Sequence, residues 1–449
     1  MAKFGGLIGA LALASAVAGC EREVILAGQR FDTRTSLDQT LPAAEGARVA
    51  DPSRPDNRTV PVALGNVVAN ADWTHRGGSA TRSMPHLALG PSPQRLWAAS
   101  IGTGSNRRAR LTVAPVVAGG TVFAMDARNR LTALSAASGG AVWSFDVTPA
   151  GESPDAASGG GLAVGDGRLF VTTGFGELIA MNPANGAVIW RQRFDGPVSG
   201  APAVVGGTVY VAGRDATGWA VNAADGTLKW VQSGVRQSAG LLGGIAPAVT
   251  DRLVVMPTSS GQVTALDRAT GEPVWQGAVA GQRAGRAAAF VADLTGDPVA
   301  AGGRIYVGSA AGRTAAFSAD TGEALWEARE GAMGPVWPVG NAVYLVSDDG
   351  RLVRLDAATG ETVWATPLGH FTNDRVRRQR SATAHYGPVL AGGRLVVVSS
   401  DGLVRFVAPD SGAMLGVIEL PGGGAAAAPA VAGGTLFVVT TGGQVQAFR

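Results

Sequence analysis

Hydrophobic residues along most of this chain fall into short runs that are separated by glycine pairs. The runs at residues 209–211, 305–307 and 436–439 are β-branched or aromatic, a composition typical of β-strands. Gly206-Gly207 and Gly433-Gly434 stand just before two of these runs, and tight turns favour glycine. The pattern therefore predicts many short strands joined by tight turns.

A longer unit recurs from about residue 90 to the end of the chain. One copy begins at Ala246-Pro247, continues through a strand at 253–255 and the turn Thr270-Gly271, and ends at Trp275. Other copies end, at intervals of 38 to 51 residues, at Trp97, Trp143, Trp190, Trp230, Trp326 and Trp364. Four strands in about 45 residues are the signature of a propeller blade. We expect each of these tryptophans to pack between neighbouring sheets.

The two ends of the repeat give the number of blades. A seventh unit has Gly416 where a tryptophan is expected, and an eighth begins at Ala428-Pro429 and stops at the last residue with three strands. Residues 94–100 offer the missing fourth strand. Because an open ring would leave unpaired edges, we predict an all-β fold, an eight-bladed β-propeller over residues 94–449. The N-terminal strand closes it by pairing with the C-terminal blade.

Composition and charge exclude two classes of protein. With 46% hydrophobic and 16% charged residues, the chain is too apolar to be disordered. Lys and Arg number 37 against 34 Asp and Glu, a near balance that predicts no nucleic-acid partner. One inter-blade segment, residues 373–380, carries four arginines. We interpret it as a solvated loop or as a contact with an acidic partner or lipid headgroups.

The first twenty residues are typical of an export signal. Lys3 precedes an apolar stretch at 7–18 that is too short to span a bilayer. The stretch leads into Val-Ala-Gly-Cys, which resembles the lipobox of bacterial lipoproteins and predicts a lipoprotein signal peptide at 1–19 with lipid on Cys20. An ordinary signal peptide with an accidental cysteine is the alternative. Glu21, in place of an aspartate, favours the outer membrane.

Two further segments lie between the lipobox and the propeller. Residues 20–60 hold Pro, Asp and Arg with weak periodicity, and they predict a flexible membrane tether. Residues 61–93 include Trp73 and a Gly77-Gly78 turn, and we expect this N-terminal segment to pack on one rim of the propeller.

The repeat, with its Ala-Pro strand, Thr-Gly turn and terminal Trp, resembles the quinoprotein-like (PQQ) propeller repeat. Combined with the lipobox and eight blades, the chain over about residues 60–449 resembles the BamB family of outer-membrane assembly lipoproteins. The resemblance implies a non-enzymatic scaffold that is lipid-anchored in the outer membrane, faces the periplasm and is monomeric within its complex. It implies BamA and the other barrel-assembly components as partners, a role in inserting outer-membrane proteins, and no catalytic, cofactor or metal residues.

The same resemblance implies a partner-binding site on two inter-blade loops. Val235 and Arg236, in the loop after Trp230, match a hydrophobic-Arg step of the family's BamA contact. Asp293 matches the first of two aspartates in the next loop, where Thr295 replaces the second. An exposed apolar residue beside an arginine is a common binding anchor.

Two other functions remain open from the sequence. One is a PQQ-dependent dehydrogenase: the large alcohol-oxidising members, which resemble this repeat, carry a vicinal cysteine pair, a calcium cluster and an aspartate base, whereas Cys20 is the one cysteine here. A glycan-binding propeller would need exposed rim aromatics, for which Trp219 and Trp337 are the candidates.

The histidines give no metal site from the sequence. Their spacing matches no metal-ligand pattern, and we expect them in exposed loops: His75, His86, His370 and His385.

Overall fold

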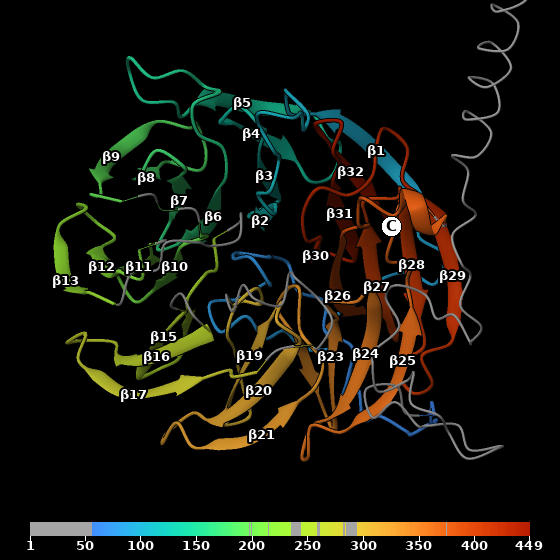
Figure 1. Cartoon of the computed structure of the whole chain (residues 1–449). Helices are drawn as coiled ribbons and strands as arrows, with labels where there is room; N and C mark the ends of the chain where they lie inside the picture. Colours follow the sequence, from blue (N-terminus) through green and yellow to red (C-terminus); the bar gives the residue numbers. More distant parts are fainter. Residues whose placement is uncertain are drawn as a thin grey trace, which may run out of the picture. The chain divides into compact units, whose positions relative to one another are not determined.

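The computed structural model of the chain is a ring of β-sheets (Figure 1). It describes residues 56–449 except for Pro197, Ser199, Arg214, 235–243, 258–260, Gln282, 284–293 and Asp374. Within these residues, the strands form eight sheets of four antiparallel strands each. The predicted all-β, eight-bladed propeller is confirmed.

Seven blades take four consecutive strands each. Blades 1 and 2 are β2 (Val116–Ala118), β3 (Thr121–Met125), β4 (Arg130–Ser135) and β5 (Ala141–Asp146), then β6 (Gly160–Gly165), β7 (Arg168–Thr173), β8 (Glu177–Met181) and β9 (Val188–Arg193). Blades 3 and 4 are β10 (Ala203–Val205), β11 (Thr208–Ala212), β12 (Gly218–Asn222) and β13 (Leu228–Gln232), then β14 (Ala248–Val249), β15 (Leu253–Pro257), β16 (Gln262–Asp267) and β17 (Pro273–Ala278). Blades 5 and 6 are β18 (Val299–Ala301), β19 (Arg304–Ser309), β20 (Arg313–Ser318) and β21 (Ala324–Ala328), then β22 (Trp337–Val339), β23 (Ala342–Val346), β24 (Arg351–Asp356) and β25 (Thr362–Pro367). Blade 7 is β26 (His385–Ala391), β27 (Arg394–Ser399), β28 (Leu403–Val407) and β29 (Met414–Glu419).

Blade 8 joins the two ends of the propeller. Its strands are β30 (Ala430–Ala432), β31 (Thr435–Val439) and β32 (Gln444–Phe448), completed by β1 (Arg95–Ser100), which pairs with β32. Beyond the strands, Gln94 and Arg449 exchange two backbone hydrogen bonds of 2.7 and 2.9 Å. The predicted closure is therefore confirmed: β32 is paired on both sides, and β1 is the outermost strand of the blade.

Burial within a blade follows the position of each strand. All five residues of β11 are buried, because the second strand is covered by neighbouring blades on both faces. In β9, the outermost strand of its blade, exposed and half-buried residues alternate. Hydrophobic runs therefore mark the inner strands, and period-two alternation marks the outer ones.

The repeat tryptophans fasten each blade to the next, as predicted. Each indole Nε1 donates a hydrogen bond of 2.9–3.2 Å to a backbone carbonyl in the turn between the third and fourth strands of the following blade. The seven pairs are Trp97–Ala136, Trp143–Pro183, Trp190–Ala223, Trp230–Arg268, Trp275–Ala319, Trp326–Ala357 and Trp364–Pro409. These contacts make the blade interfaces alike around most of the ring.

Residues 56–93 form a strap that crosses the centre of the ring (blue in Figure 1). The strap hydrogen-bonds to every one of the eight blades, mostly at the end of the innermost strand or in the turn that follows it. In order of blade, these contacts are Trp73–Val117, Thr74–Val164, His75–Val204, Ala80–Val249, Thr81–Ala300, Pro61–Asn341, Leu87–Leu390 and Asn70–Gly433. The strap thus fixes the blades from one end of the ring.

Candidate partner-binding face

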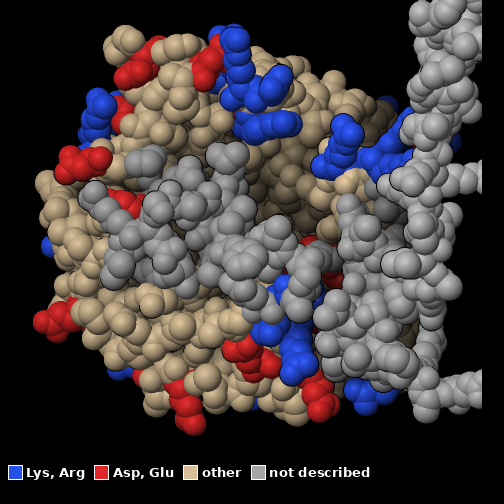
Figure 2. Space-filling view, viewed as in Figure 1, with Lys and Arg blue, Asp and Glu red and all other residues tan. Residues whose placement is uncertain are grey.

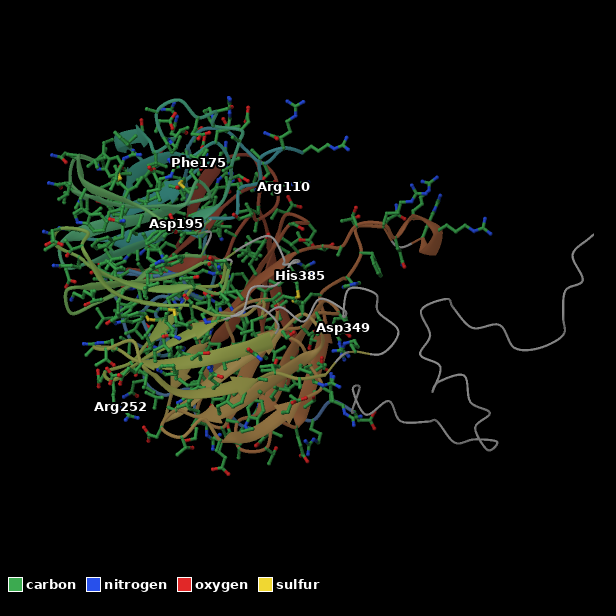
Figure 3. The ribbon with its side chains drawn as sticks, turned by 60° about the vertical axis from the view of Figure 1, so that its left-hand side comes forward. Arg110, Phe175, Asp195, Arg252, Asp349 and His385 are labelled. Atoms are coloured by element: carbon green, nitrogen blue, oxygen red, sulfur yellow. The ribbon has the colours of Figure 1, made fainter. Side chains whose placement is uncertain are left out.

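The two ends of the ring carry different kinds of connection. Four antiparallel strands return the chain to the end from which it started, so all eight inter-blade connections leave from one end, which we call the loop end. The Gly–Gly turns and the eight strap contacts given above lie at the other, the strap end. In Figure 3, Arg110, His385 and Asp349 lie toward the loop end, whereas Arg252, in a strap-end turn, lies on the opposite side.

The predicted site residues belong to two loop-end connections. Val235 and Arg236 fall between β13 and β14, and Asp293 falls between β17 and β18. All three lie outside the described residues, as does Cys20. The flanking residues, however, are described, and they connect the two segments.

The bases of both connections are joined through one strap residue. Arg76 donates from Nη1 to the carbonyl oxygen of Gly244 at 2.9 Å, and its Nε forms an ion pair with Asp297 Oδ2 at 3.1 Å. The other oxygen of Asp297 accepts a hydrogen bond of 2.9 Å from the backbone N–H of Ala246. Gly244 and Ala246 precede β14, and Asp297 precedes β18, so the strap and the two connections form one bonded unit.

Two buried strap residues support Arg76. Arg82 donates to the backbone carbonyl of Arg76 at 2.7 Å and to that of Pro247 at 2.9 Å. His75 Nε2 accepts a hydrogen bond of 3.0 Å from the N–H of Val204. Burial, together with the nearby Arg82 charge, lowers the pKa of His75 to about 3, so the ring is neutral and able to accept this bond.

The prediction of exposed histidines is wrong for three of the four. His75, His86 and His385 are buried. His86 Nε2 accepts a 2.7 Å hydrogen bond from Gly393 N–H, and His385 bonds to Ser399 Oγ and to the carbonyl of Gly369. The polar residues near these histidines in sequence predicted exposure. The strap holds His75 and His86 against the blades, and the first strand of blade 7 holds His385 against Gly369 and Ser399.

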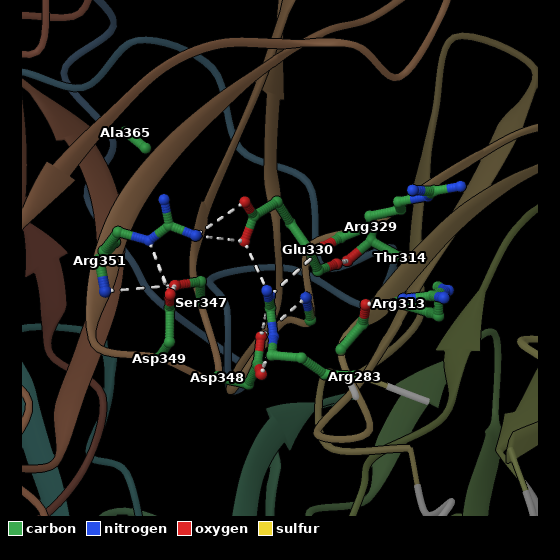
Figure 4. Close-up of polar contacts among 12 residues, drawn as sticks. Arg283, Arg313, Thr314, Arg329, Glu330, Ser347, Asp348, Asp349, Arg351 and Ala365 are labelled. Carbon is green, nitrogen blue, oxygen red and sulfur yellow. Dashed lines mark hydrogen bonds and ion pairs between the residues drawn. The ribbon is translucent and has the colours of Figure 1, made fainter. Parts of the chain in front are cut away.

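A charged network begins in the β17–β18 connection (Figure 4). Arg283, which follows β17, binds both carboxylate oxygens of Asp348 at 2.7 and 2.8 Å and reaches Glu330 at 3.1 Å. Arg351 binds the other oxygen of Glu330 at 2.9 Å and pairs with Asp349 at 2.9 Å. The network links the base of the β17–β18 connection to blades 5 and 6, and no sequence pattern predicts it.

The carboxylates of this network differ in their proton affinity. Burial raises the pKa of Glu330 to about 7, although Arg351 and Arg283 oppose the shift. Burial also opposes ionisation of Asp349, but its hydrogen bond and ion pair with Arg351 outweigh burial and lower its pKa to about 2. Within the described residues, Glu330, Asp348 and Asp349 are close enough to share a metal ion. Because Arg283 and Arg351 bind their oxygens, the set fits an ion-pair network better than a metal site.

The aromatic candidates for glycan binding are both buried. Trp219 is 8% exposed and packs against Phe194 with ring centroids 4.6 Å apart, and Trp337 is 5% exposed. Neither can present a flat ring to a sugar. Over the part of the chain that the structure describes, no helix is both long and apolar enough to cross a membrane.

Comparison with known proteins identifies the family. The model of the family described as outer membrane protein assembly factor BamB matches residues 127–366, which is 240 of the 449 residues. The chain belongs to the BamB family. It is similar to the BamB of Burkholderia pseudomallei, with 28% identity over 362 residues that cover 79% of this chain and 88% of the relative.

Solved structures agree on the fold. The BamB crystal structure from Moraxella catarrhalis aligns with a TM-score of 0.62 at 20% identity, covering 80% of this chain and 97% of that one. A quinohemoprotein alcohol dehydrogenase from Comamonas testosteroni also aligns with a TM-score of 0.62, at 15% identity and over 84% of this chain and 80% of that one. At such identities both show a shared propeller fold and nothing of function.

Proposed function

We propose that this chain is a non-enzymatic scaffold of the outer-membrane β-barrel assembly machinery, and that it binds BamA and aids the insertion of outer-membrane proteins. The match to the BamB family model over residues 127–366 carries this proposal, together with relatives that bear the name of an assembly factor. We infer that it acts as a monomer within the complex, beside the other barrel-assembly components.

The loop end supports a scaffold role through its rigidity. The strap bonds to all eight blades, and the Arg76–Asp297 pair ties the bases of two inter-blade connections together. A surface held in place before binding loses little conformational entropy when a partner docks. In this proposal Val235 and Arg236 supply the anchor for BamA, and Asp293 supplies a carboxylate from the neighbouring connection.

Binding of BamA can be tested with a triple variant. Val235→Ala, Arg236→Ala and Asp293→Ala together should reduce BamA capture at least tenfold, with an unchanged melting temperature. The matched control replaces residues of the same types that are exposed near the strap end: Val274→Ala, Arg252→Ala and Asp320→Ala. Capture by the folded test variant at wild-type affinity would move the interface elsewhere.

We also propose the location and the N-terminal organisation. A signal peptide at 1–19 would be removed, lipid on Cys20 would anchor the chain in the outer membrane facing the periplasm, and residues 20–60 would tether the 61–93 segment and the 94–449 propeller. The Val-Ala-Gly-Cys sequence supports this. Cys20→Ala should release the protein from membranes, and globomycin should cause the precursor to accumulate. Complete outer-membrane fractionation of Cys20→Ala would rule out the anchor.

The dehydrogenase alternative lacks a feature of the large alcohol-oxidising quinoproteins. The chain has one cysteine, so a vicinal cysteine pair is impossible. Absence of dye reduction when the purified protein is given pyrroloquinoline quinone, calcium and an alcohol is the outcome that our proposal expects. Turnover under those conditions would contradict it.

A further inference from the structure

Seven exposed arginines stand on two inter-blade connections at the loop end. Between β1 and β2 lie Arg107, Arg108 and Arg110, and between β25 and β26 lie Arg375, Arg377, Arg378 and Arg380. The second connection includes the short 3-10 helix η4 (Val376–Arg378), which stands off the ring at the right of Figure 3. Figure 2, which looks at the loop end, shows Lys and Arg gathered above and to the right of the central hollow.

The charges of these seven arginines are not neutralised by contacts among the residues that the structure describes. Within the described part of the chain, none of the seven guanidinium groups makes a hydrogen bond or an ion pair. Several other loop-end arginines have a carboxylate partner: Arg128 with Asp155, Arg191 with Glu177, Arg283 with Asp348, and Arg405 with Asp401. Seven unpaired guanidinium groups are therefore available to an external anion.

The charge of the whole chain hides this concentration. The segments 103–115 and 368–384 together hold seven arginines and one acidic residue, Asp374. The whole chain has 37 Lys and Arg against 34 Asp and Glu, so the rest of it has 30 against 33. The two connections thus carry a formal charge of +6, whereas the remainder is −3. The near balance of the full sequence does not describe this surface.

The strap joins the ring beside one of the two connections. Asn57 Oδ1 accepts a hydrogen bond of 2.9 Å from the N–H of Ala365, and Arg58 N–H donates to the carbonyl of Val363 at 3.0 Å. Both contacts are on β25, the outermost strand of blade 6. Arg58 is bonded to Val363 and the preceding residue, Asn57, to Ala365. Toward its N-terminus, the strap therefore runs toward the end of β25 at which the second arginine connection begins.

We propose that the seven arginines form a docking surface for anionic phospholipid headgroups of the membrane in which the chain is anchored. This inference rests on the proposed lipid on Cys20. In the proposed 20–60 tether, the 36 residues from 20 to 55 would have a root-mean-square span of about 33 Å as a flexible chain, which keeps the ring close to the bilayer. The first bonded residues of the strap, Asn57 and Arg58, lie on β25 beside the arginine connection. Guanidinium groups bind phosphate oxygens through paired hydrogen bonds, and charge near an anionic surface adds up over several residues.

Vesicle binding by unlipidated protein tests this surface directly. Residues 21–449 keep every described residue and lack Cys20. We expect this protein to float with vesicles of phosphatidylcholine and phosphatidylglycerol in equal parts, but not with phosphatidylcholine alone. Binding should be lost at about 0.5 M NaCl, where charges are screened over a few ångströms. Replacing Arg375, Arg377, Arg378 and Arg380 with glutamine should weaken binding at least about tenfold.

A matched variant controls for net charge. Arg95, Arg168, Lys229 and Arg252, all at or near the strap end, are replaced with glutamine and should leave vesicle binding within twofold of wild type. Equal losses in both variants, or no binding to the anionic vesicles, would overturn the proposal. Arginine-dependent binding to poly-glutamate without vesicle binding would also overturn it, in favour of an acidic protein partner. BamA capture is measured without vesicles, so failure of the proposed function shows separately.

Discussion

Arg76 and Asp297 form an ion pair of 3.1 Å that joins the N-terminal strap to the base of the β17–β18 connection. The carboxylate is fully buried, and the guanidinium is 25% exposed. Asp297 also holds the N–H of Ala246, at the base of the β13–β14 connection. A segment that precedes the propeller in sequence therefore fixes the spacing of two loops that follow blades 3 and 4.

Loss of Arg76 should destabilise the protein strongly. Arg76→Met leaves the buried Asp297 carboxylate without its cation, and breaking a buried pair in this way costs about 3 kcal/mol or more of unfolding free energy. Arg76→Met combined with Asp297→Asn should cost less than Arg76→Met alone, since no charge is left unpaired. Urea denaturation measures both. As a control, Arg252→Met removes an exposed pair at 3.7 Å to Asp320 and should cost less than about 1 kcal/mol. Equal costs for Arg76→Met and Arg252→Met would show that the strap pair is not structural.

Glu330 should make stability fall as pH rises. Its pKa is raised to about 7 from an ordinary value of 4.5, so between these values the folded state holds a proton that the unfolded state has released. Its contribution is complete below pH 4.5 and is lost as pH rises through 7, at up to about 1.4 kcal/mol per pH unit. Glu330→Gln should remove this dependence, as measured by unfolding free energy between pH 4.5 and 8.

His75 has the opposite effect on the pH dependence of stability from Glu330. Its pKa is lowered to about 3, so the unfolded state binds the extra proton below pH 6.5 and stability falls as pH falls. With Glu330→Gln, this second dependence should become visible below pH 6.5. Glu327→Gln, at an exposed carboxylate of β21, is the control and should keep the wild-type profile. A Glu330→Gln profile that matches wild type would contradict the assignment.

The fold was predictable because every blade repeats the same local signals, and the closure was predictable from the missing fourth strand. Even the irregular position 416 has a physical reason that the structure supplies. Gly416 lies opposite Phe406, where the tryptophans of other blades lie opposite the third strand. A tryptophan there would have to donate to a turn in blade 8, but the ends of the propeller, Gln94 and Arg449, meet at that place instead. Trp is absent where its acceptor turn is absent.

The strap and the charged network were not predictable in the same way. Trp73, Thr74, Ala80 and Leu87 use backbone groups to bind the blades, and backbone bonding leaves no residue pattern. Asp348 and Asp349 look like ordinary turn residues before Gly350, and nothing in sequence links them to Arg283. Such contacts depend on which blades lie side by side, so they follow only once the ring is known.

The tryptophan contact makes one turn glycine much less replaceable than another. Gly271 has φ +77°, and a Cβ there would lie 2.6 Å from the ring of Trp230. Gly119 has φ +56°, with nothing within 4 Å of its Cβ position. Gly119→Ala should cost about 1–2 kcal/mol, the price of a left-handed alanine. Gly271→Ala should cost at least about 2 kcal/mol more, because the blade interface must also shift. Similar melting temperatures for the two variants would mean that the indole moves aside freely.

The absent turn at blade 8 leads to a prediction about adding a tryptophan. Trp364 donates to the Pro409 carbonyl at 3.2 Å and is fully buried, so Trp364→Gly should cost about 3–5 kcal/mol, as large core truncations do. If a tryptophan stabilised through its own packing alone, Gly416→Trp in the wild-type chain should raise the free energy of unfolding by a comparable amount. Nothing lies within 4 Å of a Cβ at position 416 that would prevent it. We expect no gain, because the neighbouring blade offers two chain ends in place of a turn carbonyl and its glycine. Thermal unfolding of the two variants measures this. A rise in melting temperature for Gly416→Trp comparable to the fall for Trp364→Gly would show that the indole does not need the turn.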